Sequence, residues 1–426
     1  MTGLRSTPAA GRTGIERAGR AARGAVRSLD VRSEEEAQRA IDALYAAGTP
    51  INVRGAGHLL DLRAPPEGGV RLVNRIRTRL ETNAAGEIVA STGWRWAEVV
   101  DFAQRRGLTF PVLTSNLDTT VGGTLSAGGF GLFSGRFGMQ ADHVSACTIH
   151  TALGAAGCAR SGEALWRAAL CSLGTIGFVS SVTLRARPAP ERLRLFDRRD
   201  EPGAAVEVVL DAAERFADEA CLLTCRFENG TATTHVGFEG AAPSPGIAWR
   251  ERDVSYASLL AGSTIEANPN IRRVWNDYIM PVAASGPFLH LALAMLERAD
   301  RDERVLRARV RLLAIAQAPA TGTSFYVRPG VLAASRTIGV GFYLDVADDD
   351  AGGFAFCLEL HGLLKAACAA AGGALYNSGE VRLSQGDCNA AFGADWHAFT
   401  QARGRYDPAG LFGNGSTLPF AAPPAP

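Results

Sequence analysis

Two glycine-rich segments in the first third of the chain have the residue types that bind a phosphate-bearing ligand. The shorter is Arg54-Gly55-Ala56-Gly57-His58, and the longer runs from Thr119 to Gly131, with five glycines between Gly122 and Gly131. Glycine lets a backbone approach a ligand closely, and the N–H groups of such turns donate to phosphate oxygens. The pattern predicts two loops that enclose the pyrophosphate of a dinucleotide, and an ordinary irregular loop is the alternative.

Several other nucleotide and metal sites are disfavoured. No Gly-x-Gly-x-x-Gly follows a first strand with an acidic residue about twenty positions later, and no Gly-x4-Gly-Lys-[Ser/Thr] occurs, which argues against Rossmann and P-loop sites. No His-Glu-x-x-His and no Cys/His cluster at ligand spacing occurs, so no metal is expected. The eight cysteines are scattered without a Cys-x-x-Cys pair, which is typical of reduced thiols in a cytoplasmic protein.

Short elements on either side would position the glycine-rich segments. Ser33 and Glu36 form a capping box for a helix that ends near Gly48. A strand at 51–53 leads into the shorter segment, and a second turn, Gly174-Thr175-Ile176-Gly177, precedes an alternating strand at 182–186. Further expected elements are strands at 70–73, 87–90 and 144–151 and helices at 96–106 and 163–170.

A domain boundary is expected near residue 190, where Arg187-Pro188-Ala189-Pro190 ends this region. The following part, to about residue 390, has a mixed pattern of strands and helices. Its predicted strands are 220–225, 233–238, 288–292 and 338–345, and its predicted helices are 204–216, 299–316 and 354–370. The tail at 396–411 is expected to form a helix and then a turn.

Composition limits the classes of partner. The chain has 426 residues, of which 47% are hydrophobic and 20% charged, an ordinary globular balance with enough chain for two or three domains. Its 44 basic and 43 acidic residues give a net charge of +1, so neither nucleic acid nor a membrane is expected as a partner. No apolar run is long enough for a transmembrane helix. The Arg-rich residues 1–30 lack the apolar core of a secretory signal, and both a surface arm and a transit peptide stay open.

Taken in order, these segments resemble the FAD-binding domain of the vanillyl-alcohol oxidase superfamily (PCMH type), in particular its cytokinin dehydrogenase and berberine bridge enzyme branches. The resemblance covers about residues 31–190, and the tail segment Arg405-Tyr406-Asp407-Pro408-Ala409-Gly410-Leu411-Phe412 resembles the closing segment of these flavoproteins. It implies an α+β, two-domain PCMH-type fold with a substrate (cap) domain over the flavin. The implied parts are an N-terminal arm at 1–30, the FAD-binding domain at 31–190, the cap domain at 191–395 and a C-terminal segment at 396–426 that returns to the FAD-binding domain.

The resemblance implies FAD as the cofactor and assigns its binding residues to the glycine-rich segments and the turn before the strand at 182–186. They are Arg54, Gly55, Ala56, Gly57, His58, Thr119, Thr120, Gly122, Gly123, Thr124, Ser126, Ala127, Gly128, Gly174, Ile176, Gly177 and Val179.

His58 occupies the position of a histidine that these families often bond covalently to the flavin. The residues after it, Leu59-Leu60-Asp61, depart from the family pattern, so covalent attachment, non-covalent contact and an unrelated loop histidine all stay open. The second anchor of berberine bridge enzymes, a cysteine, is matched by Asn116, which argues against two covalent bonds. The catalytic aspartate of cytokinin dehydrogenases is matched by Ser115, which argues against a cytokinin substrate.

Four residues are candidates for the catalytic base. Asp118 lies three residues after Ser115, and Asp277 stands in the mixed aromatic and acidic segment Trp275-Asn276-Asp277-Tyr278. Tyr376 and Glu380 precede the tail, where the superfamily often supplies active-site groups, with Arg382 as a partner for an anion or the flavin. Structural roles at the edge of a strand or helix, or in surface ion pairs, are the alternatives.

The resemblance implies oxidation of a small organic alcohol or amine, with a hydride passing to flavin N5 and electrons then passing to oxygen or another acceptor. A role in secondary metabolism also fits. Three alternatives stay open: a redox-neutral cyclase or isomerase of the same fold, an NAD(P)H-using reductase on the related fold of cell-wall precursor synthesis, and a non-catalytic flavin-binding module. The substrate and the oligomeric state are not predicted.

Overall fold

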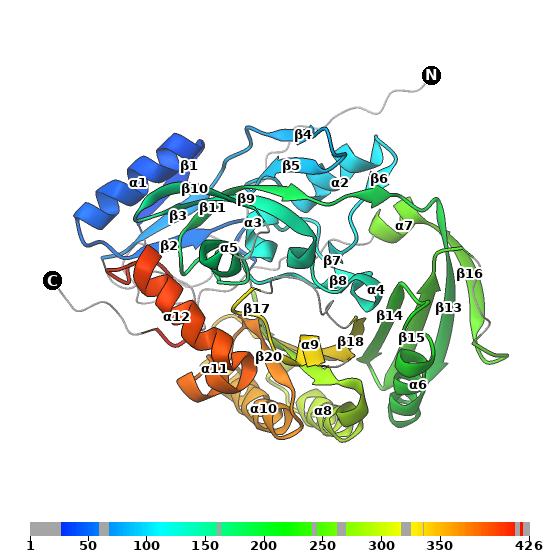
Figure 1. Cartoon of the computed structure of the whole chain (residues 1–426). Coiled ribbons are helices and arrows are strands. Elements are labelled where there is room, and N and C mark those ends of the chain that lie inside the picture. The colour runs from blue at the N-terminus through cyan, green and yellow to red at the C-terminus, as the bar shows by residue number, and fades with distance from the viewer. Residues whose placement is uncertain are drawn as a thin grey trace.

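The computed structural model describes residues 27–58, 68–159, 163–240, 245–261, 270–316, 325–334, 336–413 and 418–420. Most of the predicted N-terminal arm (residues 1–26), and Leu59-Leu60-Asp61 after His58, lie outside this part of the chain. Figure 1 shows two layered bodies, one built from the first half of the chain and one from a large sheet with helices on its outer face. The change from one sheet system to the other falls between β12 (Arg187–Pro188) and β13 (Arg192–Asp200).

The first body begins with a three-stranded parallel sheet in the order β1-β3-β2. Its strands are β1 (Arg27–Val31), β2 (Ile51–Arg54) and β3 (Val70–Asn74). Helix α1 (Glu34–Ala46) packs on it because its apolar positions recur on one face, and Ala37 and Ile41 are fully buried. The structure contains one half of the predicted capping box: Ser33 is the N-cap, and its Oγ accepts from the Glu36 N–H at 3.1 Å. The Glu36 carboxylate accepts from the N–H of Arg32, one residue before the N-cap, at 2.7 Å.

A second, five-stranded sheet in the order β10-β9-β11-β5-β4 completes the frame of this body. Its strands are β4 (Leu80–Thr82), β5 (Ile88–Ser91), β9 (Val144–Thr151), β10 (Gly154–Ala159) and β11 (Phe178–Leu184). The remaining elements are α2 (Trp96–Gln104), β6 (Leu108–Thr109), β7 (Leu113–Thr114), α3 (Val121–Leu125), β8 (Gly131–Leu132), α4 (Ser134–Phe137) and α5 (Ala164–Ala169). The shorter glycine-rich segment follows β2 of the first sheet, and the longer one, which contains α3, lies between β5 and β9 of the second sheet in the chain.

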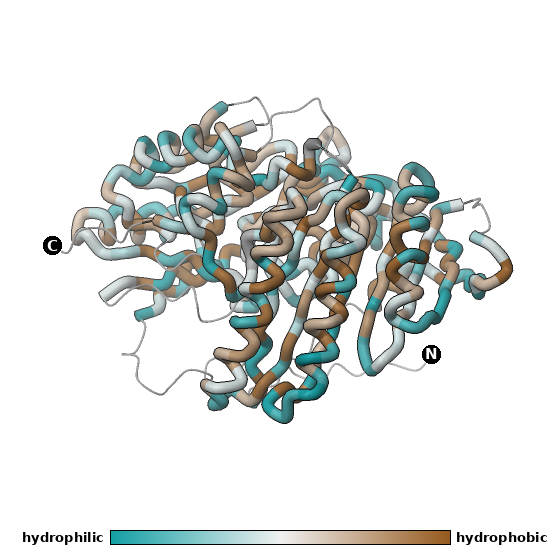
Figure 2. The backbone as a smooth tube through the Cα atoms, turned by 90° about the horizontal axis from the view of Figure 1, so that it is seen from below, coloured by the Kyte–Doolittle hydropathy of each residue, from teal (hydrophilic) through white to brown (hydrophobic). Residues whose placement is uncertain are grey.

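The second body is an eight-stranded antiparallel sheet in the order β16-β13-β15-β14-β18-β19-β17-β20. Its other strands are β14 (Leu222–Glu228), β15 (Thr231–Phe238), β16 (Arg250–Ser255), β17 (Ile271–Pro281), β18 (Val305–Ile315), β19 (Thr337–Ala347) and β20 (Ala374–Gly379). Helices α6 (Pro202–Arg215), α8 (Ser285–Asp300) and α10 (Ala351–Ala370) lie side by side on one face of this sheet (Figure 2). The opposite face is turned toward the first body (Figure 1).

Strand parity decides which residues of the large sheet face which side, because successive side chains of a strand alternate. Val274, Tyr278 and Met280 of β17 are buried on the helix side, where the Tyr278 ring packs against Phe288 of α8 and His361 of α10. The odd-numbered residues of β17, β18 and β19 therefore face the first body.

Two predictions about this sheet are wrong. Residues 299–316, predicted as one helix, form the end of α8 and then strand β18, and residues 288–292, predicted as a strand, lie inside α8. In β18 the alternation of arginine with apolar residues from Arg307 to Leu312 gives a strand one polar and one buried face, which outweighs the helix propensity of Leu, Ala and Arg. The short apolar run at 288–292 fits either element by itself, and only its long flanks make it helical.

Helix α10 is long and apolar enough to cross a membrane by length and composition, with a mean hydropathy of 1.3. In the structure it is a core helix. Its residues Phe356, Cys357, Leu360 and Leu364 are buried, and it packs against β17 and β19.

The second body also contains the short helices α7 (Tyr256–Ala261) and α9 (Val331–Ala334). After the final helices α11 (Gln385–Phe392) and α12 (Ala394–Tyr406), the chain returns to the first body. The Ile51 N–H donates to the Leu411 carbonyl at 2.7 Å, and the Gly413 N–H donates to the Ile51 carbonyl at 3.0 Å. Arg403, itself largely buried, donates to the carbonyls of Gly410 and Phe412 and holds this turn in place. The tail thus lies beside β2, the strand that leads into Arg54-Gly55-Ala56-Gly57-His58.

Candidate functional site

The two glycine-rich segments meet in the structure. A Cβ at Gly55 would lie 2.1 Å from Thr120 Oγ1 and 3.5 Å from the Gly123 Cα, so the backbones approach each other only because position 55 has no side chain. Thr120 is the N-cap of α3, and its hydroxyl accepts from the Gly123 N–H at 3.3 Å. The predicted enclosure of one ligand by two loops is therefore geometrically consistent.

The shorter segment presents unpaired backbone donors. Within the described residues, the N–H groups of Gly55, Ala56, Gly57 and His58 make no hydrogen bond to the protein. Gly57 has φ +82°, a left-handed conformation that strains other residues. Consecutive free N–H groups around such a residue form a concave anion site, which is the arrangement that a pyrophosphate requires.

The third segment predicted to bind the cofactor lies against the second. The Leu173 N–H donates to the Ser126 carbonyl at 2.7 Å, just before the turn at Gly174, where φ is +72°. Thr92 contacts both the second and the third segment. A Cβ at Gly122 would lie 2.9 Å from Thr92 Cβ, and the Thr92 hydroxyl donates to the Val179 carbonyl at 2.6 Å. The structure thus brings together all three segments that were predicted from the sequence.

His58 stands at the edge of this group. Its Nδ1 lies 3.4 Å from the Nδ2 of Asn116, the residue at the position of the second covalent anchor in berberine bridge enzymes. Burial lowers the pKa of His58, and the nearby Asp118 opposes that shift. A lowered pKa keeps the imidazole neutral near pH 7, so that one ring nitrogen has a free lone pair for bond formation.

Comparison with known proteins identifies the first body. Residues 28–156 match the FAD binding domain family. These residues are an FAD-binding domain of the PCMH type. The prediction of FAD as cofactor is confirmed.

The curated relatives match this chain over less than half of its length. An uncharacterized oxidoreductase of the fasciation locus of Rhodococcoides fascians is 35% identical over 167 residues, which cover 39% of this chain and 38% of that protein. Cytokinin dehydrogenase 10 of Oryza sativa subsp. japonica is 32% identical over 165 residues, which cover 34% of this chain and 29% of that protein. The chain therefore matches less than two-fifths of the length of these relatives.

Solved structures extend the likeness to both bodies. A glucooligosaccharide oxidase from Acremonium strictum, whose FAD is a 6-S-cysteinyl, 8α-N1-histidyl derivative, has a TM-score of 0.75 at 15% identity and covers 93% of this chain and 92% of that chain. The 6-hydroxy-D-nicotine oxidase of Arthrobacter nicotinovorans has a TM-score of 0.70 at 19% identity and covers 93% and 92%. The predicted two-domain PCMH-type fold is confirmed, and we call the second body the cap domain.

Further features of the FAD-binding domain fit the cofactor. The amide of Gln140 is buried, and neither its Oε1 nor its Nε2 has a hydrogen-bond partner in the protein. A Cβ at Gly129 would lie 2.0 Å from that Oε1, so the unpaired amide is beside the longer glycine-rich segment. Burying an amide without partners is costly, and a polar ligand in this loop would remove that cost. The four free N–H groups and this amide are the donors and acceptors that would hold FAD.

Of the four candidate bases, Asp277 has the clearest setting on the cap face that is turned toward the FAD-binding domain. Tyr343 of the neighbouring strand β19 donates its hydroxyl to Asp277 Oδ1 at 3.0 Å. The pair can form because residue 341 is glycine: a Cβ there would lie 2.4 Å from Asp277 Oδ1 and 2.6 Å from Tyr343 Oη. Burial raises the pKa of Asp277 to about 7, although the Tyr343 hydrogen bond and the Arg311 charge lower it. A carboxyl group that titrates near neutral pH is suited to general base catalysis.

The Asp277–Tyr343 pair lies close to the boundary between the domains. A Cβ at Gly339, two residues before Gly341 on β19, would lie 3.2 Å from the Phe130 ring. Phe130 belongs to the longer glycine-rich segment. Two residues of a strand span about 7 Å, so the pair is roughly one pleat repeat from a direct contact with the FAD-binding domain.

The other three candidates have different surroundings. Tyr376 also faces the FAD-binding domain: its hydroxyl accepts from the Gly129 N–H at 3.0 Å, and its ring packs edge-on against Phe130 at 4.5 Å. Asp118 is half-exposed and forms an ion pair with Arg95 at 3.5 Å beside His58. Glu380 lies toward the helix side, 3.8 Å from Arg272, whose guanidinium stacks on Phe354 of α10.

The structure thus places Tyr376 and Asp277 on the cap face, Asp118 near His58, and Glu380 away from both. Arg382 is exposed, and its carbonyl accepts from Lys365 at 3.2 Å. Tyr343 and the arginines of β18 were missed by the sequence prediction. The alternating pattern Arg307-Ala308-Arg309-Val310-Arg311 is the signal that could have found them, because it places three arginines on one face of a strand.

Proposed function

We propose that this protein is an FAD-dependent oxidoreductase that oxidises a small organic alcohol or amine. The observation that carries the proposal is the Asp277–Tyr343 pair on the cap face, beside the part of the FAD-binding domain that contains Phe130. When bound, the flavin of FAD accepts a hydride from a substrate C–H bond, and oxygen or another acceptor later takes the electrons. The oxidase and dehydrogenase names of the relatives support the same class of reaction.

The residues of the chain supply the proton transfer. Asp277 is buried, whereas Tyr343 is more exposed, so Tyr343 is the group that a substrate hydroxyl or amine reaches first. The substrate gives its proton to Tyr343 Oη while Tyr343 passes its own proton to Asp277. The raised pKa of Tyr343 keeps the phenol protonated in the resting state, ready for this exchange.

Covalent attachment through His58 is tested by acid precipitation. The wild-type protein is expected to leave a yellow pellet, because a covalent bond survives unfolding, and His58→Ala is expected to release its flavin into the supernatant. Absorbance of pellet and supernatant after denaturation measures this. His143→Ala is the matched control, since its ring bonds the Phe137 carbonyl at 2.7 Å instead. A yellow pellet from His58→Ala contradicts the assignment of His58.

The proposed reaction is tested by anaerobic mixing with a panel of primary alcohols, secondary alcohols and amines. We expect bleaching of the flavin absorbance by at least one compound of the panel and recovery of the absorbance on addition of oxygen or an artificial acceptor. Product analysis should show the matching carbonyl or imine. Bleaching by NADPH alone would favour the reductase alternative. A yellow protein that rearranges a substrate without bleaching would favour the redox-neutral alternative.

A further inference from the structure

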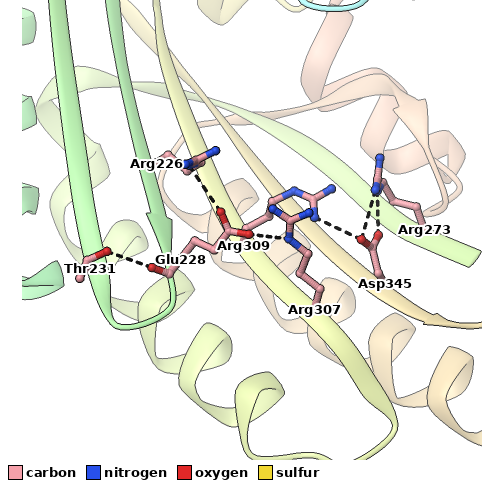
Figure 3. Close-up of polar contacts among 7 residues, drawn as sticks. All are labelled: Arg226, Glu228, Thr231, Arg273, Arg307, Arg309 and Asp345. Carbon is pink, nitrogen blue, oxygen red and sulfur yellow. Dashed lines mark hydrogen bonds and ion pairs between the residues drawn. The ribbon is translucent and has the colours of Figure 1, made fainter. Parts of the chain in front are cut away.

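The cap face opposite the helices carries a dense group of charged side chains. Strand β18 contributes Arg307, Arg309 and Arg311, and the neighbouring strands contribute Arg226 of β14 and Arg273 of β17. Two carboxylates, Glu228 and Asp345, lie among them. Figure 3 shows these side chains, apart from Arg311, in a row across neighbouring strands, with the carboxylates between the arginines.

Most of these arginines are neutralised by the two carboxylates. Glu228 forms ion pairs with Arg307 and, at 3.5 Å, with Arg226. Asp345 forms ion pairs with Arg273 at 2.7 Å and with Arg309 at 3.2 Å. Each carboxylate therefore serves two guanidinium groups, and the group as a whole keeps an excess of positive charge.

Two features of this group are unsatisfied. Arg311 makes no hydrogen bond or ion pair with any described residue, and its charge acts at longer range on Asp277. Arg309 has only 4% of its side chain exposed, and its Nε has no hydrogen-bond partner. A buried guanidinium N–H without a partner is costly. Arg311 is exposed, so it is the member of this pair that an added acceptor can reach directly.

These two arginines are next to the proposed proton-transfer pair. The Cζ of Arg309 lies 5.4 Å from the centroid of the Tyr343 ring, and the Cζ of Arg311 lies 6.0 Å from it. The Trp275 ring stacks on the Tyr343 ring at 6.0 Å. An acceptor bound by the arginines and a hydroxyl at Tyr343 Oη would fit within one small molecule, and the two stacked rings give it an aromatic neighbour.

We propose that the substrate carries a carboxylate, which binds Arg311 with a contribution from Arg309 while the oxidised hydroxyl or amine lies at Tyr343. This inference rests on the proposed function and names its substrate class: a hydroxy or amino carboxylic acid. The planar guanidinium fork matches the two oxygens of a carboxylate. A singly charged group is favoured over a phosphate because the carboxylate of Asp277, on which the Arg311 charge also acts, would repel a second negative charge.

The proposal is tested by binding to the FAD-loaded protein, without turnover. Benzoate and benzamide are matched in shape and differ in charge, and phenyl phosphate is a doubly charged comparison. Isothermal titration calorimetry and the flavin difference spectrum report their affinities. We expect benzoate to bind at least about 10-fold more tightly than benzamide, and Arg311→Gln to weaken benzoate binding by about 10- to 100-fold with benzamide unchanged.

Two further variants separate binding from folding. Arg309→Lys keeps the positive charge and the ion pair with Asp345 but removes the fork, and should weaken benzoate by a smaller factor. Arg298→Gln removes an exposed arginine of α8, on the opposite side of the sheet, and should leave benzoate binding unchanged.

Equal affinity for benzoate and benzamide, or unchanged benzoate binding in Arg311→Gln, would overturn the inference. Tighter binding of phenyl phosphate than of benzoate would overturn the choice of a carboxylate. If neutral alcohols bleach the flavin while benzoate does not bind, the carboxylate inference fails and the proposed oxidoreductase function stands. If benzoate binds through Arg311 but no alcohol or amine bleaches the flavin, the carboxylate inference stands and the proposed oxidoreductase function fails.

Discussion

Replacing Asp277 with asparagine is expected to lower kcat by about 100- to 10,000-fold, the range typical for loss of a general base. The amide still accepts the hydrogen bond from Tyr343 but takes up no proton at neutral pH. The change is nearly isosteric, so the protein should keep its fold and its FAD. Stopped-flow reduction of the flavin by the substrate found in the anaerobic panel measures the effect on the chemical step.

The pH dependence gives the same residue a second signature. Because burial raises the pKa of Asp277 to about 7, its carboxylate is the minor form below that pH, and kcat/KM should rise with pH through about 7. The rise should disappear in Asp277→Asn. In Arg311→Gln the rise of kcat/KM should occur at higher pH than in the wild type, because the Arg311 charge lowers the pKa of Asp277. If Asp277→Asn reduced its flavin at the wild-type rate, or if its kcat/KM still rose with pH through about 7, the base would be another residue. Tyr376 would then be the next candidate.

Breaking the ion pair between Asp142 and Arg328 is expected to cost about 3–5 kcal/mol of unfolding free energy, as for other buried pairs that lose one partner. Asp142 belongs to the FAD-binding domain, and Arg328 to the chain between β18 and β19 of the cap domain. Both side chains are 6% exposed, and the second guanidinium nitrogen of Arg328 lies 2.9 Å from Asp142 Oδ2. In Arg328→Met the carboxylate of Asp142 would stay buried without its cation.

Chemical denaturation of the FAD-loaded proteins measures this effect. The matched control is Arg336→Met, which removes an exposed pair with Asp218 at 2.7 Å and should cost less than about 1 kcal/mol. The double variant Asp142→Leu/Arg328→Met should be less destabilised than Arg328→Met, because no buried charge is left unpaired. Equal losses in Arg328→Met and Arg336→Met would show that the Asp142–Arg328 pair does not hold the domains together.

The features that the sequence predicted are local ones. Glycines at positions 55 and 122 are needed because the backbone there lies close to other residues. A glycine-rich run can be recognised within one short stretch of sequence. The N-cap at Ser33 is equally local. His58 stands out because it ends a glycine-rich turn, and the order of these segments was enough to predict the fold of the FAD-binding domain.

The features that were missed depend on contacts between distant segments. Asp277 and Tyr343 meet because β17 and β19 pair with Trp275 opposite Tyr343 and Asp277 opposite Gly341, and this register is not encoded in either strand alone. The arginines of β18 were hidden by a wrong helix prediction over 299–316, since Leu, Ala and Arg all favour helices. Once the strand is known, its alternation places the arginines on the cap face. A candidate base could be named from the sequence, but its partner and its charged neighbours could not.

The contact between Ile51 and the segment from Leu411 to Gly413 bears on the order in which the protein matures. Strand β2, which leads into Arg54-Gly55-Ala56-Gly57-His58, gains this neighbour only when the segment from Leu411 to Gly413 has been synthesised. Closing a contact across so much intervening chain is slow compared with forming local turns. The first body is therefore completed late in biogenesis, after the cap domain has been synthesised between its two parts.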